Sequence, residues 1–158
     1  MAAGGDVRAL FDAARARLAG SPRERIGDWA ASRKLLGFGR APRIVPVGEA
    51  WHVGVLLIGD AEVYATGEVL RARTEAPRGY TAQAQRERSE RAAAAARGGF
   101  ADGEVVHLGA VPIDLDALAQ GQASGPLLLV DRVPHVRWSA TGAPRPLADY
   151  LDEQLGLR

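Results

Sequence analysis

The spacing of apolar residues at the start of the chain predicts two helices joined by a short turn. Over 7–19 the helical period is marked by Val7, Leu10, Phe11, Ala14 and Leu18. Asp6 is placed to cap this helix and Gly20 to end it. Ser21-Pro22-Arg23-Glu24 then has the pattern of a capping box with proline at the first helical position, and an apolar period continues to Leu36. We therefore predict a helical pair over 1–36.

From residue 43 onward the apolar pattern is that of strands. Short apolar segments at 43–47, 51–58, 61–66 and 68–73 are separated by glycine-containing turns, which predicts an antiparallel meander. The run from Trp51 to Ile58 is almost continuously apolar, as expected of a strand covered on both faces. Pro46 restricts the first segment to an edge or terminal strand.

The rest of the chain mixes helices and strands. An alanine-rich helix is predicted at 82–97, a strand at 104–108, a helical turn at 114–120, and a hairpin formed by 127–130 and 133–138. Leu147, Leu151 and Leu155 share one face of a C-terminal helix that begins near Pro146. We predict a single α+β domain over 1–158, with the helical pair at 1–36 and a sheet-centred body at 43–158. Its antiparallel sheet, a meander plus a second hairpin, would be packed by the N-terminal pair, the central alanine-rich helix and the C-terminal helix.

Composition narrows the classes of protein. The 158 residues include no cysteine, which excludes disulfides, thiolate metal ligands and cysteine nucleophiles. The longest apolar run, Val53 to Ile58, is too short to cross a bilayer, and residues 1–6 lack the apolar core of a secretory signal. We therefore expect a soluble, cytoplasmic protein with no membrane partner.

Several short motifs carry a family resemblance. Arg43-Ile44-Val45-Pro46-Val47-Gly48, Gly54-Val55-Leu56-Leu57-Ile58 and Tyr64-Ala65-Thr66-Gly67 resemble a family of small actinobacterial proteins of no established function. Some of its members carry a glutaminase label, which the residues do not support. A serine amidase of the Ser-x-x-Lys type needs serine three positions before lysine, and Ala31 precedes Lys34, the only lysine.

The three histidines, His52, His107 and His135, all fall on predicted strands. Three converging imidazoles would form a zinc site, but strand alternation argues against convergence. His135 is expected to face water beside Arg137, whereas His52 is expected on the face of Leu56 and Ile58. We therefore predict no metal site and no cofactor.

Asp114 and Asp116 form a D-x-D pair that could hold Mg²⁺ or Ca²⁺. The calcium-loop pattern needs a further oxygen donor two positions on, where Leu118 stands. We favour a capping role at the start of a short helix.

The segment 15–43 is strongly basic, with eight basic and two acidic residues and a net charge of +6. Such a segment could bind nucleic acid or another polyanion, or simply form a solvated face. The candidate anion-binding residues are Arg23, Arg25, Arg33, Lys34, Arg40 and Arg43.

The sequence establishes no function. Because no nucleophile–base pair, metal cluster or phosphate loop is present in the sequence pattern, we favour a non-catalytic interaction or small-ligand-binding domain, with a homodimer among its possible forms. Two alternatives stay open: polyanion binding through 15–43, and an enzyme whose site is assembled from dispersed His, Asp and Arg residues.

Overall fold

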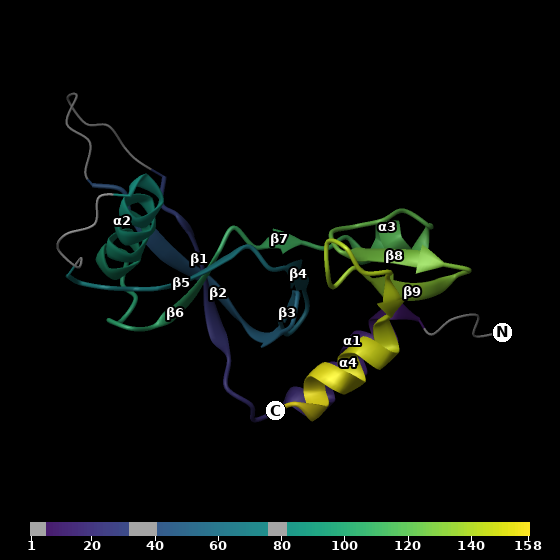
Figure 1. The fold of residues 1–158 in the computed structure, drawn as a ribbon. Coiled ribbons are helices and arrows are strands. Elements are labelled where there is room, and N and C mark those ends of the chain that lie inside the picture. The colour runs from purple at the N-terminus through teal and green to yellow at the C-terminus, as the bar shows by residue number, and fades with distance from the viewer. Residues whose placement is uncertain (1–5, 32–40, 76–81) are drawn as a thin grey trace. The chain divides into compact units, whose positions relative to one another are not determined.

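The computed structural model describes residues 6–31, 41–75 and 82–158 (Figure 1). Over these residues the chain forms four helices, a seven-stranded mixed sheet and a three-stranded antiparallel sheet, which confirms the predicted α+β class. The strand order of the larger sheet is β5-β6-β1-β2-β3-β4-β7.

The chain divides into two compact units. The first unit comprises Met1–Arg23, Ala50–Thr66 and Val111–Arg158, and the second comprises Glu24–Glu49 and Gly67–Ala110. Strand β2 (Ile44–Val53) begins in the second unit and ends in the first. The single domain expected over 1–158 stays a prediction, and each unit is described by itself.

The second unit is a sheet with one helix. It contains β1 (Glu24–Trp29), the start of β2, β5 (Glu68–Arg71), α2 (Gln83–Arg97) and β6 (Val105–Leu108). β1 runs parallel to β6, with Ile26 opposite His107, and β5 runs antiparallel to β6. The predicted alanine-rich helix is confirmed, and its small side chains allow close packing. The core of the second unit consists of Ile44, Leu70, Ala72, Ala94, Ala95, Phe100, Val106 and Leu108.

The second predicted helix is wrong over the described residues, because Glu24–Trp29 is strand β1. Its capping box is a purely local signal, whereas Ile26 and Gly27 are buried by pairing with a strand some 80 residues away along the chain. A Cβ at Gly27 would lie 2.7 Å from Ile44 Cγ2 and 2.8 Å from Val106 Cγ1. Tertiary packing therefore overrides helix propensity here. Residues 32–36 of the predicted helix lie outside the described residues.

The first unit contains the remaining elements. These are α1 (Val7–Leu18), the end of β2, β3 (Leu56–Ile58), β4 (Val63–Ala65), β7 (Val111–Pro112), α3 (Leu115–Ala119), β8 (Leu127–Val130), β9 (Val133–Val136), β10 (Arg145–Pro146) and α4 (Leu147–Gly156). The predicted first helix is confirmed: Asp6 accepts a hydrogen bond from Arg8 N at 3.1 Å, and Gly20 has φ +84°. The C-terminal helix is also confirmed.

The apolar run 51–58 is a hairpin rather than one strand. β2 ends at Val53, Gly54 turns with φ +59°, and β3 begins at Leu56. The Tyr150 hydroxyl accepts a hydrogen bond from Val55 N at 3.0 Å and would lie 1.9 Å from a Cβ at Gly54. A side chain at 54 is therefore excluded by both the backbone angle and the tyrosine.

The predicted four-strand meander is correct only for β2, β3 and β4. β4 pairs next with β7, whereas β5 pairs with β6. The pairing of β2 with β3 covers Trp51 to Val53, and Pro46 lies earlier in β2, before this pairing begins. The second predicted hairpin is confirmed as β8 and β9, turning through Asp131 and Arg132 with φ +50° and +66°.

Candidate functional sites

The basic segment is the first candidate, and the structure describes three of its six predicted residues. Arg23 donates to Asp60 Oδ1 at 2.6 Å and lies 4.0 Å from the centroid of the Trp51 ring. This hydrogen bond lowers the pKa of Asp60. Arg43 is exposed, and Arg33, Lys34 and Arg40 lie outside the described residues.

Arg25 is held equally firmly in the second unit. Its Nε and Nη2 donate to the two carboxylate oxygens of Glu104 at 2.6 and 2.7 Å, and its guanidinium lies 4.7 Å from the Phe100 ring centroid. The hydrogen bond from Arg25 lowers the pKa of Glu104, aided by the bond from Ala101 N. Arg23 and Arg25 therefore already have acidic partners, so the described part of the segment offers an anion less charge than the sequence suggests.

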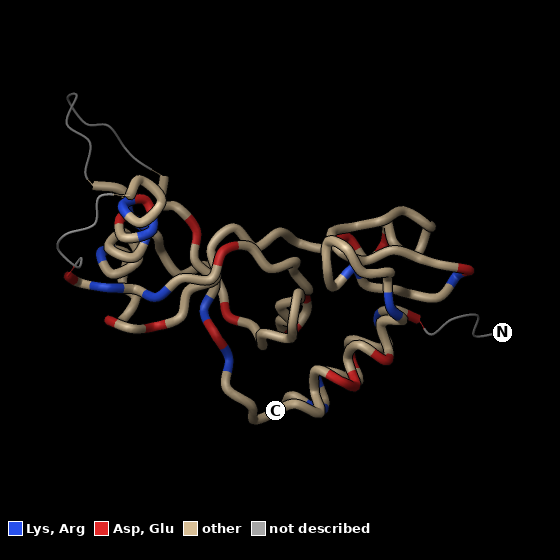
Figure 2. The backbone as a smooth tube through the Cα atoms, viewed as in Figure 1, with Lys and Arg blue, Asp and Glu red and all other residues tan. Residues whose placement is uncertain are grey.

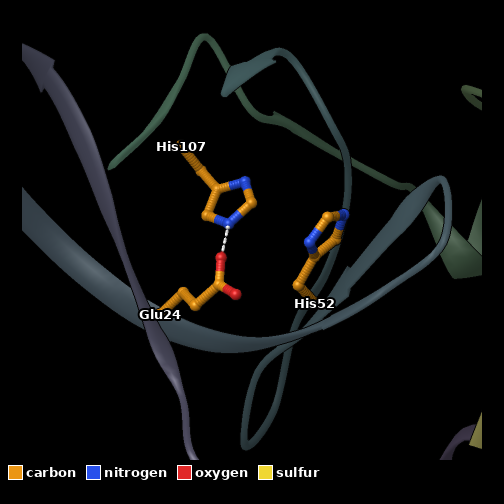
Figure 3. Close-up of side chains that lie close together, drawn as sticks. All are labelled: Glu24, His52 and His107. Atoms are coloured by element: carbon orange, nitrogen blue, oxygen red, sulfur yellow. Dashed lines mark hydrogen bonds and ion pairs between the residues drawn. The ribbon is translucent and has the colours of Figure 1, made fainter. Parts of the chain in front are cut away.

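The second candidate is the pair formed by Glu24 and His107 on neighbouring strands of the second unit. Figure 3 shows His107 Nε2 facing the Glu24 carboxylate, with a hydrogen bond between them. His107 is fully buried, whereas 35% of the Glu24 side chain is exposed. The pair arises because β1 runs parallel to β6, so side chains near the Ile26–His107 register position share one face of the sheet.

The other two histidines belong to the first unit. His52 pairs with Leu57 across the β2–β3 hairpin. The expectation that His52 lies on the face of Leu56 and Ile58 is therefore wrong, because a turn separates the strand of His52 from the strand of these two residues. Its Nε2 lies 2.9 Å from Gly54 O. His135 is half-buried, next to the exposed Arg137, and its Nδ1 lies 2.8 Å from Val133 O. Since a carbonyl oxygen only accepts, Nδ1 carries the proton of that bond.

The third candidate is one face of the three-stranded sheet, which we call the outer face. In the β8–β9 hairpin, Leu127 and Leu129 pair with Val136 and Pro134 and turn toward the core. The alternate positions form the outer face: Leu128, Val130, Val133 and His135, together with Pro146, which pairs with His135. Val130 and Val133 are 38% and 36% exposed.

The D-x-D pair is divided between two structural roles. Asp114 accepts from Ala117 N at 2.9 Å and caps α3, as predicted. Asp116 accepts from Arg8 Nη2 at 2.5 Å. Each carboxylate therefore has a structural role, Asp114 as a helix cap and Asp116 in an ion pair with Arg8 of α1.

Two of these candidates were missed in the sequence for identifiable reasons. Glu24 was assigned to a helical capping box, and the strand predicted at 104–108 carries no local signal that it pairs in parallel with residues 24–29. The outer face is hidden because Leu127-Leu128-Leu129-Val130 is apolar at every position, so no alternation marks which residues point outward.

Comparison with known proteins adds no function. No protein-family model, no curated protein and no solved structure matches the chain. In the described part of the chain, no helix has the length and apolar character required to cross a membrane.

Proposed function

We propose that the chain is a non-catalytic interaction domain that binds a second copy of itself through the outer face of β8, β9 and β10. The observation that carries the proposal is an apolar sheet face that is half exposed. An antiparallel sheet with one face in water normally places polar residues there. Here that face carries Leu128, Val130, Val133 and Pro146 around a single histidine.

The charges at the tip of the hairpin favour a second copy as the occupant. Asp131 and Arg132 are adjacent and exposed, and Figure 2 shows the acidic and basic residues side by side at the end of the β8–β9 hairpin. A two-fold axis that runs along the hairpin, between β8 and β9, would bring Asp131 of one copy toward Arg132 of the other. The apolar side chains of the outer face would then meet those of the second copy, and the acidic residue at each hairpin tip would meet the basic residue of the other.

The size of the face sets the expected strength. Stable interfaces bury about 800 Å² on each partner and involve about 20 to 30 residues a side. Five partly buried side chains provide much less, so we expect reversible association with a Kd in roughly the micromolar range or weaker.

The test is a charge placed on the outer face. Val130→Asp would bring two like charges together across the axis, and we expect dimerisation to weaken about 10-fold or more, about 1.4 kcal/mol. Sedimentation equilibrium of the full chain over a range of concentrations measures this directly. The matched control is Val111→Asp, since Val111 is 59% exposed on β7 of the same unit but away from the outer face.

Two results contradict the proposal. One is a wild-type chain that stays monomeric at millimolar concentration, and the other is equal association by Val130→Asp and Val111→Asp. The chain has no cysteine, so a single introduced cysteine provides a second test by disulfide cross-linking. Val133→Cys should oxidise to a covalent dimer at concentrations where Val111→Cys stays monomeric.

A further inference from the structure

We infer that Glu24 and His107 bind a divalent transition-metal ion, for which Zn²⁺ is the reference. This site lies in the second unit and does not depend on the proposed self-association. The central feature of the site is the fully buried imidazole of His107, whose Nε2 points at the Glu24 carboxylate. In the described residues the ligand atoms of this pair lie within 4.8 Å of each other.

The sheet holds both side chains in place. β6 lies between β5 and β1, and β1 lies between β6 and β2, so both are interior strands. Ile26 opposite His107 fixes the parallel register, and Glu24 stands two positions before Ile26, on the same face. His107 is fully buried, so its ring has little freedom to turn away. A donor pair fixed in this way loses little conformational entropy when it binds an ion.

The donor chemistry selects the class of ion. One imidazole nitrogen and one carboxylate oxygen suit Zn²⁺ and neighbouring divalent metals such as Co²⁺, whereas Mg²⁺ and Ca²⁺ prefer oxygen donors alone. Binding of the ion would break the hydrogen bond between Nε2 and the carboxylate. The ring would then carry its proton on Nδ1, any further proton would leave to water, and the Nε2 lone pair would bind the metal. The partly exposed Glu24 side chain provides the approach from solvent. Positions not filled by these two donors would be taken by water, as in sites with open coordination.

A purely structural hydrogen bond between Glu24 and His107 makes a different prediction. In that case added metal would neither bind at this position nor change the His107 ring. The two interpretations are separated by experiments on the full-length chain after treatment with a chelator.

The first experiment measures metal affinity. Zn²⁺ is titrated in competition with a chromophoric chelator, and Co²⁺ is titrated while its visible absorption is recorded. We expect one equivalent to bind and Glu24→Gln to weaken binding at least 10-fold, since glutamine keeps the shape but removes the charge. Glu87→Gln on α2 is the matched control for the carboxylate. Equal affinity of wild type and Glu24→Gln would overturn the inference.

The second experiment uses the wild-type chain, so its outcome does not depend on whether a variant folds correctly. Long-range ¹H–¹⁵N spectra of the wild-type chain report both ring nitrogens of each histidine during the Zn²⁺ titration. We expect the Nε2 resonance of His107 to move with one equivalent of metal while the resonances of His135 stay in place. If His107 does not respond, or only His135 responds, the inference is wrong.

Discussion

At the scale of single residues, the clearest electrostatic feature is the two-point contact between Arg25 and Glu104. Both oxygens of Glu104 accept from one guanidinium, and one of them also accepts from Ala101 N at 3.0 Å. A fork-to-fork pair of this kind is more directional than a single ion contact. It links β1 to the turn that leads into β6, so its contribution is to the second unit's sheet.

This contact predicts a defined pH dependence of stability. Because the pKa of Glu104 is lowered in the folded chain, its stabilising effect is full above the unfolded value of about 4.3 and is lost as the pH falls through the folded value. Partial exposure of Arg25 weakens the effect through solvent screening. We expect Glu104→Gln to lower the free energy of unfolding by about 1 kcal/mol at pH 7.

The measurement is urea denaturation of wild type and Glu104→Gln from pH 7 down to pH 3. The difference between them should shrink toward zero at the acid end, while Glu87→Gln, on the exposed part of α2, should show no comparable trend. A difference that stays constant with pH would mean that the charge of Glu104 contributes nothing.

At the scale of elements, the end of α2 is fixed by its contact with β2. Gly98 follows the last helical residue, and a Cβ there would lie 1.6 Å from Ile44 O. A backbone carbonyl cannot move aside as a flexible side chain can. Glycine at 98 is therefore required by the packing of the helix end on the strand.

We expect Gly98→Ala to destabilise the chain by about 3 kcal/mol or more, since helix and strand must separate to admit the methyl group. Gly48→Ala is the matched control in the same unit, because nothing lies within 4 Å of a Cβ at that position. Its effect should stay within about 1 kcal/mol. Thermal or denaturant unfolding of the two variants decides the matter, and similar losses in both would contradict the packing argument.

The elements that were predictable from the sequence are those defined by local signals. Asp6 and Asp114 cap α1 and α3 as expected, and the alanine tract of α2 and the leucine spacing of α4 gave correct helices. β1 was mistaken for a helix because it is a strand only through its pairing with β6, and local patterns do not reveal a pairing between segments so far apart in the sequence. The Glu24–His107 pair was missed for the same reason, since it exists only through that pairing.

At the scale of the whole molecule, distant segments of the sequence build each unit. The parallel pairing places Arg25 opposite Val106 in the second unit, and Arg17 contacts Asp152 at 2.6 Å in the first. Contacts of this kind require large loops to close before they stabilise the chain. The sequence could therefore indicate the α+β class and the hairpins between neighbouring strands, but not the pairings between strands far apart in the chain, such as β1 with β6 and β4 with β7.

The same topology predicts slow folding. Chains dominated by non-local pairing fold on the order of milliseconds to seconds, whereas helical chains rich in local contacts fold faster. We expect the refolding time of the full chain to be on the order of milliseconds to seconds, as measured by stopped-flow mixing with detection of tryptophan fluorescence. Complete refolding within microseconds would show that the long-range pairs do not limit the rate.

The contact between Tyr150 and Gly54 has a consequence for how the sequence can change over evolutionary time. The tyrosine hydroxyl occupies the space of a Cβ at 54 and also accepts the Val55 amide hydrogen. A mutation at 54 is therefore harmful while Tyr150 is present, and loss of Tyr150 leaves that amide without its acceptor. Because Gly54 also has φ +59°, loss of Tyr150 does not make a side chain at 54 favourable. Each change destabilises the turn for its own reason, so we expect the two residues to be retained together over evolutionary time.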